Sequence, residues 1–595
     1  MDRATALKDL RACLKTIGVD AMIIPSNDCH FGEYVQNYFC VRAWLSGFDG
    51  SAGTLVVTAD KALLWTDSRY FIQAADQLKG SEIELMKMRM EGTPTVEEWL
   101  NTHFLGDSSF RVAIDGSIFS IEEYNTLSSK LSGSVVVIDD PFNKIWKERE
   151  PIHFGHIDLL DERYSGESVI SKRQRIAEAL QMEDESTVYI LSKCDDIMYL
   201  CNLRGCDVDY NPVALSYAVV RKDFIIIFGN ETSFSAQAHE YLAYQSVAIL
   251  PYNTFFSYLE QLPPDVRKIV KYDSTSVKVR ESAGNINLVE DSTPGGTVSY
   301  LKSIKNDTET EGFKEAFLMD GIAWCKLLKY IDDNIETGTL NEYNVALQLI
   351  EYRKQCIDYR GESFEPIVAM NANAASAHYS VSNAQDASKI IPEGFLLMDT
   401  GAHYLFGTTD TTRTISLSPL SQVQIDDYTL VLKGMIQLSM AVFPKGTRGS
   451  QLDILARGPI MNKGKMYFHG TGHGIGHYLC VHEGPQSIRM EYNPVTLEPG
   501  MIQSNEPAVY VEGKYGIRTE NVILVTSYRK NDVNTFYNFE TLTLVPIDTK
   551  CINKNLLGES CIEWLNDYHR QVFDSLSPYL SDEENVWLSQ KTAAI

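Results

Sequence analysis

The sequence predicts two similar α/β domains followed by a larger α+β domain. Helix-like segments and short apolar strand-like segments alternate from residue 4 to residue 138, and the same order returns from about residue 171; this alternation is typical of α/β folds. From about Tyr300, long amphipathic helices and β-branched strands bounded by glycines replace that pattern. A chain of 595 residues has room for three to four domains of about 150 residues each. The expected domains are 1–150, 151–299 and 300–595.

The composition is that of an ordinary globular protein with an excess of acidic residues. Hydrophobic residues make up 44% of the chain and charged residues 22%. The 53 basic and 79 acidic residues give a net charge of −26, which opposes binding to nucleic acid or anionic membranes because such binding needs clustered Lys and Arg. No signal peptide is evident, and no apolar run reaches the roughly 20 residues of a membrane span. The eleven cysteines form no Cys-x-x-Cys pair, which favours reduced thiols in a cytoplasmic protein.

Local patterns define the elements of the first domain. Leu7, Leu10 and Leu14 recur at helical spacing, which predicts a helix over 4–17. Short apolar runs bounded by turn residues predict strands. The remaining elements are strands at 21–24, 54–58 and 62–65, a helix at 68–78, a strand at 135–138 and a linker over 139–167.

The second domain repeats this order. The expected elements are a helix at 173–180, a strand at 188–191, a helix at 195–201 and strands at 218–220 and 224–227. Because helix, strand, helix, strand and strand follow one another as in residues 4–65, the sequence predicts a structural repeat. Residues 202–205 form either a ligand loop or a packed turn between helix and strand, and the packed turn is favoured.

The third domain combines helices with an antiparallel sheet. The expected helices are 309–335, 341–356, 423–443, 558–575 and 582–591, and the expected strands are 394–399, 411–417, 516–526 and 542–545. The two C-terminal helices carry no pattern with a chemical meaning, so we expect them to pack or to form an interface.

A glycine-rich stretch with regularly spaced histidines, residues 469–477, is the strongest signal of a site. Glycines are costly inside a helix but are suited to sharp bends and to close packing of the backbone. Imidazoles on such a backbone point into a space rather than into a core, and neutral imidazole is a common metal ligand and general acid or base. A lone histidine is more often structural, whereas His469, His473 and His477 together favour a site.

The chain also supplies oxygen ligands for a metal. Asp399 ends an apolar strand and Asp410 begins the returning strand, so the two carboxylates should lie side by side. Glu506 and Glu520 lie at the ends of later apolar segments, and His473 completes a set of five. A single acidic residue after a strand is usually a turn or cap residue, but four crowded carboxylates need compensating cations.

The ligand set favours two divalent ions rather than a structural zinc site. One imidazole and four carboxylates are richer in oxygen than structural zinc sites, which prefer Cys and His. The set suits a pair of Mn²⁺, Co²⁺, Zn²⁺ or Fe²⁺ ions, with Mn²⁺ favoured by the hard ligands. Two metals about 3.5–4 Å apart can activate a bridging water and polarise a carbonyl, which is the chemistry of amide hydrolysis.

The order of these ligands and the motifs around them resemble a known family of metallopeptidases. The motifs are MDTGA at 398–402, GTTDTTRT at 407–414, HGTGHGIG at 469–476, VHEGP at 481–485 and YGIRTEN at 515–521. They resemble the dinuclear site of the pita-bread metallopeptidases, which include methionine aminopeptidase, prolidase and aminopeptidase P, and within them the proline-specific branch.

Further motifs outside the site resemble the long, three-domain cytosolic form of aminopeptidase P. They are SGFDGSAGT at 46–54, WTDSRYF at 65–71, NLRG at 202–205, NPV at 211–213, LTLVP at 542–546 and WLNDYH at 564–569. The resemblance implies two creatinase-like N-terminal α/β domains before a catalytic pita-bread α+β domain with a C-terminal extension. It also implies a homodimer formed through the C-terminal domain.

The resemblance implies release of the N-terminal residue from peptides that have proline in second position, through a hydroxide bridged between two metals. In that scheme Asp399 holds one metal, Asp410 and Glu520 bridge both, and His473 and Glu506 hold the other. Glu506 also takes the proton of the attacking water. An X-Pro bond suits such a site, because its nitrogen has no hydrogen and the proline ring fixes φ.

The resemblance also assigns residues to the substrate. His469, His482 and His378 would surround the substrate and steady the tetrahedral intermediate. Arg518 would support the bridging carboxylate. Arg69 would reach the substrate from the first domain.

Two departures from the family pattern and two rival functions remain open. Asn505 precedes Glu506 where an aspartate is expected. His477 stands where a small residue is common, and it is expected either beside the ligands or on the surface.

One rival function is that of a prolidase, which cleaves only X-Pro dipeptides; the long N-terminal half argues against it. The other is a non-catalytic peptide-binding module on the same fold, against which the complete ligand set argues.

Overall fold

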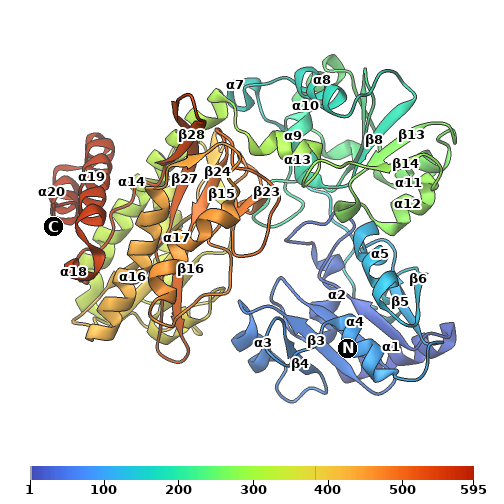
Figure 1. Cartoon of the computed structure of the whole chain (residues 1–595), viewed down its shortest axis with the longest axis horizontal. Helices are drawn as coiled ribbons and strands as arrows, with labels where there is room; N and C mark the ends of the chain where they lie inside the picture. Colours follow the sequence, from blue (N-terminus) through green and yellow to red (C-terminus); the bar gives the residue numbers. More distant parts are fainter. Residues whose placement is uncertain (1–2, 382) are drawn as a thin grey trace. The chain divides into compact units, whose positions relative to one another are not determined.

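The computed structural model describes residues 3–381 and 383–595. The chain forms two compact units (Figure 1). The N-terminal unit comprises Met1–Leu160 with Glu167–Val298, and the C-terminal unit comprises Asp161–Gly166 with Ser299–Ile595. No helix among the described residues is both long and apolar enough to cross a membrane.

The N-terminal unit contains two six-stranded sheets with the same topology. The first has the order β4-β3-β2-β1-β5-β6 and the second β12-β11-β10-β8-β13-β14. In the first, β1 pairs antiparallel with β2 and parallel with β5; in the second, β8 pairs antiparallel with β10 and parallel with β13. The predicted structural repeat is therefore confirmed.

Each predicted helix and strand of this unit is present within a few residues of its predicted bounds, and further elements that were not predicted lie between and after them. In the first sheet the observed elements are β1 (Ala21–Ile24), β2 (Thr54–Thr58), β3 (Ala62–Thr66), β4 (Glu84–Lys87), β5 (Arg111–Asp115) and β6 (Ser134–Ile138), with α1 (Arg3–Ile17), α2 (Val41–Ser46), α3 (Phe71–Gln77), α4 (Val96–His103) and α5 (Ile121–Lys130). In the second they are β8 (Thr187–Leu191), β10 (Tyr217–Val220), β11 (Ile225–Gly229), β12 (Val247–Pro251), β13 (Arg267–Val270) and β14 (Leu288–Glu290), with α8 (Val169–Ala179), α9 (Cys194–Cys201), α10 (Ala236–Tyr244), α11 (Phe255–Glu260) and α12 (Val277–Ala283).

The expected linker over 139–167 contains short elements of its own. One of them, β7 (Asp158–Leu159), pairs with β9 (Leu203–Arg204). Asn202 before β9 is buried in the left-handed conformation (φ 52°), and its side-chain amide donates to Glu167 O and to the Tyr241 hydroxyl. Residues 202–205 therefore form the packed turn rather than an open ligand loop.

The C-terminal unit packs helices against antiparallel sheets. One sheet has the order β16-β17-β20 and another β21-β28-β27-β24-β22-β23. The first comprises β16 (Ile367–Met370), β17 (Phe395–Thr400) and β20 (Thr411–Ser416). The second comprises β21 (Phe443–Pro444), β28 (Thr535–Thr541), β27 (Asn521–Lys530), β24 (Ile502–Asn505), β22 (Gly472–Gly474) and β23 (Glu483–Ile488). Smaller strands are β15 (Tyr359–Glu362), β18 (Ala402–Tyr404), β19 (Gly407–Thr408), β25 (Ala508–Val511) and β26 (Tyr515–Arg518).

The helices of this unit range from 4 to 28 residues in length. They are α13 (Thr297–Ser303), α14 (Asp307–Asn334), α15 (Glu342–Arg353), α16 (Gln422–Ser439), α17 (Gly449–Met461), α18 (Lys554–Leu557), α19 (Glu559–Leu576) and α20 (Asp582–Lys591). Asn306 and Glu309 form a capping box that starts α14. The C-terminal helices α19 and α20 pack on α14, at the red end of the colour scale in Figure 1.

Two predicted strands of this unit are wrong. Residues 516–526 form two strands, β26 and β27, because the chain turns between them at Thr519–Glu520. Residues 542–545 are extended but belong to no sheet, because side chains take over the hydrogen bonds of a ladder. Val545 O accepts from the Tyr568 hydroxyl at 2.7 Å, and the Thr543 hydroxyl accepts from Val522 N at 2.8 Å.

Candidate metal centre

A strand pair brings the two predicted aspartates together. In the antiparallel pair β17–β20, Asp399 lies opposite Thr412, and Asp410 immediately precedes β20. Both aspartates are buried. Because the side chains of residues opposite each other project from the same face of a sheet, the strand–turn–strand expected from the sequence places these carboxylates near one another.

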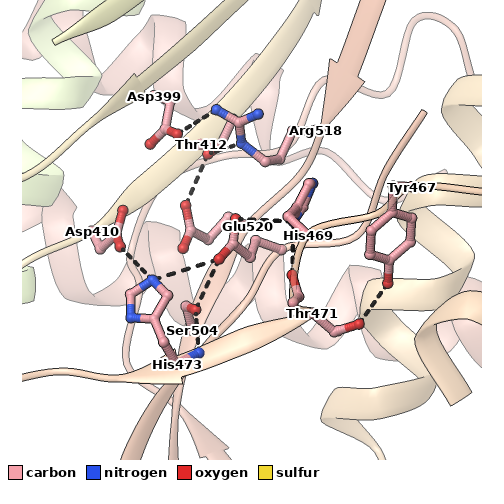
Figure 2. Close-up of polar contacts among 12 residues, drawn as sticks. Asp399, Asp410, Thr412, Tyr467, His469, Thr471, His473, Ser504, Arg518 and Glu520 are labelled. Atoms are coloured by element: carbon pink, nitrogen blue, oxygen red, sulfur yellow. Dashed lines mark hydrogen bonds and ion pairs between the residues drawn. The ribbon is translucent and has the colours of Figure 1, made fainter. Parts of the chain in front are cut away.

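The second sheet contributes the other three residues of the predicted set. His473 is the middle residue of β22, Glu506 follows β24, and Glu520 lies between β26 and β27. Ligand atoms of Asp410, His473 and Glu520 all lie within 4.8 Å of one another. Figure 2 shows the His473 ring facing Asp410 and the neighbouring carboxylates. Among residues 3–381 and 383–595, this is the one group of three or more His, Cys, Asp or Glu side chains close enough to share a metal ion. Asp399 and Glu506 lie beside this group but outside it.

The His473 ring is oriented for a cation. Its Nδ1 lies 3.0 Å from Gly474 O and donates to it, which leaves Nε2 to face the carboxylates. Nε2 is 3.4 Å from Asp410 Oδ2 and 3.5 Å from Glu506 Oε1. Burial lowers the pKa of His473, but the hydrogen bond to Asp410 and the charge of Glu506 outweigh it and raise the pKa to about 9. A metal cation can replace the proton that these carboxylates attract to the ring.

The carboxylates themselves fit a metal. Asp399 Oδ1 and Glu520 Oε1 are buried without a hydrogen-bond partner in the described part of the chain. Burial raises the pKa of Glu506 to about 7, with His473 and Arg518 opposing the rise. Burial and the charges of Asp410 and Glu506 raise the pKa of Glu520. Buried carboxylates that repel one another and keep oxygens unpaired match the donor set of a pair of divalent cations.

Arg518 is placed beside Asp399. Its Nη2 pairs with Asp399 Oδ2, its Nε donates to the Thr412 hydroxyl at 3.2 Å, and its Nη1 donates to the Tyr510 hydroxyl at 2.6 Å. Figure 2 shows the Arg518 guanidinium between Asp399 and Thr412. The ion pair is thus made with Asp399, and not with Asp410 or Glu520, the carboxylates expected to bridge.

The predicted substrate histidines lie around this centre. His469 Nε2 is 3.0 Å from the Tyr510 hydroxyl, and its Nδ1 is 3.9 Å from Glu506 Oε2. Burial, reinforced by the charge of Arg518, lowers the pKa of His469 well below its usual value, and the charge of His378 lowers it further. The ring of His482 meets that of His473 edge-on, with 4.4 Å between ring centroids.

Arg69 lies in the N-terminal unit, so its predicted contact with substrate stays a prediction. Within that unit its guanidinium binds both carboxylate oxygens of Asp67, at 2.9 and 2.8 Å. It also lies over the ring of Tyr70.

The glycines of the 469–477 stretch allow three strands to approach closely. A Cβ on Gly472 would lie 2.0 Å from Ser504 O, and one on Gly474 would lie 2.4 Å from Glu483 O. Both distances are shorter than any real contact, so only glycine lets β22 pack between β24 and β23. His477, at the end of this stretch, is only 3% exposed and packs edge-on against Phe313; the surface alternative for His477 is wrong.

Several residues of the centre escaped sequence reasoning. Tyr510 lies on β25 and contacts both Arg518 and His469, but a tyrosine in an apolar strand carries no signal. Glu342 begins α15, and its carboxylate accepts from Met370 N, Ser388 N and the Tyr379 hydroxyl. It thereby holds the segment that contains His378, over a separation in sequence that no local pattern reveals.

The fold and the centre together define the class of the protein. Two aspartates on paired strands, a histidine on a glycine-lined strand and two glutamates at strand ends form a donor set that fits a metal-dependent hydrolase. They lie on or beside antiparallel strands of the C-terminal unit, which follows two α/β domains of equal topology in the sequence.

Comparison with known proteins identifies the family: the chain belongs to metallopeptidase family M24, in the group of long Xaa-Pro aminopeptidases. The M24 profile matches residues 311–527, the creatinase/prolidase N-terminal domain matches 7–145 and again 148–309, and the C-terminal region of M24 peptidases matches 535–595.

Relatives of full length support this assignment. A probable Xaa-Pro aminopeptidase P of Coprinopsis cinerea is 37% identical over 620 residues, covering 100% of this chain and 99% of its own. Xaa-Pro aminopeptidase 1 of Dictyostelium discoideum is 35% identical, covering 97% and 94%. The crystal structure of X-prolyl aminopeptidase from Caenorhabditis elegans, described as a cytosolic enzyme with a di-nuclear active site, has a TM-score of 0.94, 31% identity and full coverage of both chains. The predicted fold class and family are confirmed.

Proposed function

We infer that this chain is an Xaa-Pro aminopeptidase that releases the N-terminal residue from peptides with proline in second position. The observation that carries this function is the convergence of Asp410, His473 and Glu520 on one point, with Asp399 and Glu506 beside them. It is supported by relatives that carry this activity in their names and match the chain from end to end.

The centre is a dinuclear metal site, and we assign its ions as Mn²⁺ because hard oxygen donors predominate. Asp399 would hold one ion, His473 and Glu506 would hold the other, and Asp410 and Glu520 would be shared by both. When bound, the pair of ions polarises the scissile carbonyl and makes water a nucleophile near neutral pH. Co²⁺, Zn²⁺ or Fe²⁺ are the alternative ions.

The chain itself contributes proton transfer and orientation. Glu506 accepts a proton from the attacking water at a carboxylate oxygen. His469 stays neutral at pH 7 because its pKa is low. Its Nδ1 donates to Gly470 O at 2.7 Å and its Nε2 accepts from the Tyr510 hydroxyl at 3.0 Å, so its ring faces the substrate without adding a positive charge. His378 and His482 complete the wall around the substrate. Arg518 holds the Asp399 carboxylate in place, and Arg69 reaches the substrate from the first domain.

The specificity for proline follows from what the centre can hold. The X-Pro nitrogen has no hydrogen to donate and the ring fixes φ, so recognition depends on contact with the pyrrolidine ring. Imidazole and tyrosine rings at His469, His482 and Tyr510 offer such contacts. The carboxylates attract the free ammonium of the substrate, which favours removal of an N-terminal residue over cleavage within a chain.

The rest of the molecule completes the proposal. We assign 1–150 and 151–299 as the creatinase-like domains and 300–595 as the catalytic domain with its extension. The protein acts in the cytoplasm, as the Caenorhabditis elegans relative is described to do. It forms a homodimer through the C-terminal domain, where Ile454 and Met461 of α17 leave 56% and 42% of their surface exposed.

Peptide cleavage tests this function against both rivals. The purified chain, with and without Mn²⁺, is given Arg-Pro-Pro and an X-Pro dipeptide, and free arginine or product amino acid is measured. We expect Mn²⁺-dependent release of arginine from the tripeptide and loss of at least about a thousandfold in Asp410→Ala, since a ligand shared by both ions is removed. Cleavage of the dipeptide alone would indicate a prolidase. No cleavage and no bound metal would indicate the binding module.

A further inference from the structure

One buried guanidinium links the metal centre to the C-terminal extension. Arg413 lies on β20, three residues after Asp410, and is 1% exposed. Its Nη1 donates to Glu520 O, its Nε donates to Pro546 O at 3.2 Å, and its Nη2 donates to Val545 O at 2.9 Å. Nη2 also donates to the Tyr568 hydroxyl at 2.9 Å.

Glu520 depends on these contacts for its position. It lies between β26 and β27, outside both ladders. Its N–H donates to Thr412 O at 3.1 Å, its Oε2 accepts from the Thr412 hydroxyl at 2.8 Å, and its carbonyl accepts from Arg413. Oε1 makes no hydrogen bond within the described residues and remains for a cation. The carbonyl of Glu520 is thus fixed by one charged donor, and a charge-assisted bond of this kind is stronger than a neutral one.

Tyr568, together with Asn521 Oδ1 at 2.7 Å, holds the Nη2 side of that guanidinium. It lies on α19 and is 3% exposed, with its ring stacked on Trp564 at 5.2 Å between centroids. Its hydroxyl donates to Val545 O at 2.7 Å, which aims the oxygen at Arg413 Nη2. Because a guanidinium is planar and rigid, fixing Nη2 also fixes the direction in which Nη1 points toward Glu520.

We propose that Tyr568 is a positioning residue for the metal-binding carboxylate Glu520, acting through Arg413. The proposal rests on the proposed metal-dependent function. It gives the C-terminal extension a part in placing a metal ligand, although none of the five proposed ligands lies in that extension. Residues 542–547 and α19 then serve to hold the Arg413 guanidinium in one orientation.

The test compares two substitutions that each remove one buried hydroxyl. Tyr568→Phe in the full-length chain keeps the ring and its stacking. The matched control is Tyr428→Phe on α16, whose buried hydroxyl donates to Asp548 O at 2.7 Å but has no part in the Arg413 contacts. Mn²⁺ binding is measured by calorimetry and by metal content after dialysis, apart from any cleavage assay; kcat and KM for Arg-Pro-Pro are measured separately.

We expect Tyr568→Phe to weaken Mn²⁺ binding and lower kcat by about tenfold each, the size of effect seen when a group behind a metal ligand is removed. KM should change by less than about twofold. Tyr428→Phe should match the parent chain in Mn²⁺ affinity and kcat. Equal Mn²⁺ affinity in the two variants, with only the melting temperature of Tyr568→Phe lowered, would overturn the proposal.

A double substitution tests the route through Arg413. Arg413→Lys keeps the positive charge but loses the planar set of N–H donors of the guanidinium. We therefore expect a larger loss of Mn²⁺ affinity than in Tyr568→Phe. Adding Tyr568→Phe to Arg413→Lys should then cost little more, because both act on one interaction. If the losses of Mn²⁺ affinity in Arg413→Lys and Tyr568→Phe add fully in the double variant, Tyr568 does not act through Arg413. A parent chain that binds two Mn²⁺ but cleaves no X-Pro peptide would refute the proposed function and leave the positioning role to be judged by Mn²⁺ affinity.

Discussion

His469 and His473 belong to the same glycine-rich stretch, yet their surroundings drive their pKa values in opposite directions. Burial lowers both. For His473 the neighbouring Asp410 and Glu506 reverse the effect and raise the pKa to about 9. For His469 the charge of Arg518 adds to burial and keeps the pKa low. One imidazole is therefore surrounded as a cation ligand, and the other as a neutral hydrogen-bonding group.

Tyr510 connects the second of these histidines to Arg518. Tyr510→Phe leaves Arg518 Nη1 and His469 Nε2 without the hydroxyl they share, at 2.6 and 3.0 Å. We expect kcat/KM for Arg-Pro-Pro to fall by a factor of about 30, corresponding to about 2 kcal/mol for a lost bond to a charged group. Mn²⁺ binding should also weaken, by about tenfold, because Tyr510 acts on the proposed ligand Asp399 through Arg518.

The control for this substitution is Tyr515→Phe on the neighbouring strand β26. The Tyr515 hydroxyl donates to Asp427 at 2.7 Å and not to Arg518 or His469. Its kcat/KM should equal that of the parent chain. A similar loss in both variants would mean that the hydroxyls act through stability alone.

At the scale of elements, the sequence predicted those helices and strands whose signal lies in the local spacing of apolar residues. The helices α14, α16 and α19 follow from apolar residues three and four positions apart. Helix α17 was missed because it contains Gly458 and Pro459, which argue against a helix. The predicted strand at 516–526 ignored the turn at Glu520, and 542–545 lacks a partner strand because Arg413 and Tyr568 bond its backbone.

His569, on helix α19, is expected to make the stability of the chain depend on pH. Burial, reinforced by the charge of Arg413, lowers the pKa of His569 to about 4. Ile547 N donates to its Nε2 at 3.1 Å, which requires that nitrogen to be unprotonated. In the unfolded chain the pKa is about 6.5. Between these values the unfolded state binds more protons than the folded state, so the free energy of unfolding falls as pH falls from about 6.5 to about 4, by about 3 kcal/mol in total.

The substitution His569→Gln removes this contribution. Urea unfolding at pH 7 and pH 4.5 measures the free energy of unfolding of each chain. The loss on acidification should be smaller in His569→Gln than in the parent by about 2–3 kcal/mol. Equal losses would show that His569 is already protonated in the folded chain.

At the scale of the whole molecule, the metal centre belongs to one of two units. Removing metal with EDTA leaves the carboxylates of Asp399, Asp410 and Glu520 to repel one another. A metal ion present at a hundred times its Kd stabilises the folded state by about 2.7 kcal/mol, and this contribution is lost as well. We expect faster hydrogen exchange in β17, β20 and β22 after EDTA, and unchanged exchange in β1–β6 of the N-terminal unit. Exchange that rises equally in both units would contradict this assignment.

The apolar face of α17 predicts the oligomeric state. Ile454 and Met461 are seven residues apart on one helix and therefore share a face. Sedimentation should show a dimer for the parent chain and a monomer for Ile454→Glu, since burying an unpaired charge in an interface costs several kcal/mol. Lys463→Glu, in the exposed turn after α17, serves as the charge control and should remain dimeric. A dimeric Ile454→Glu chain would place the interface elsewhere.

By itself the sequence determined the class of fold and the repeat in the N-terminal half, and it supplied the proposed set of metal-binding side chains, because periodicity, glycine spacing and motif order are written along the chain. Only the tertiary structure decided that Arg518 pairs with Asp399, that Glu342 holds the segment of His378, and that Arg413 and Tyr568 hold Glu520. Each of these contacts joins residues far apart in sequence, so its energy depends on how separate elements pack, and no local pattern carries that information.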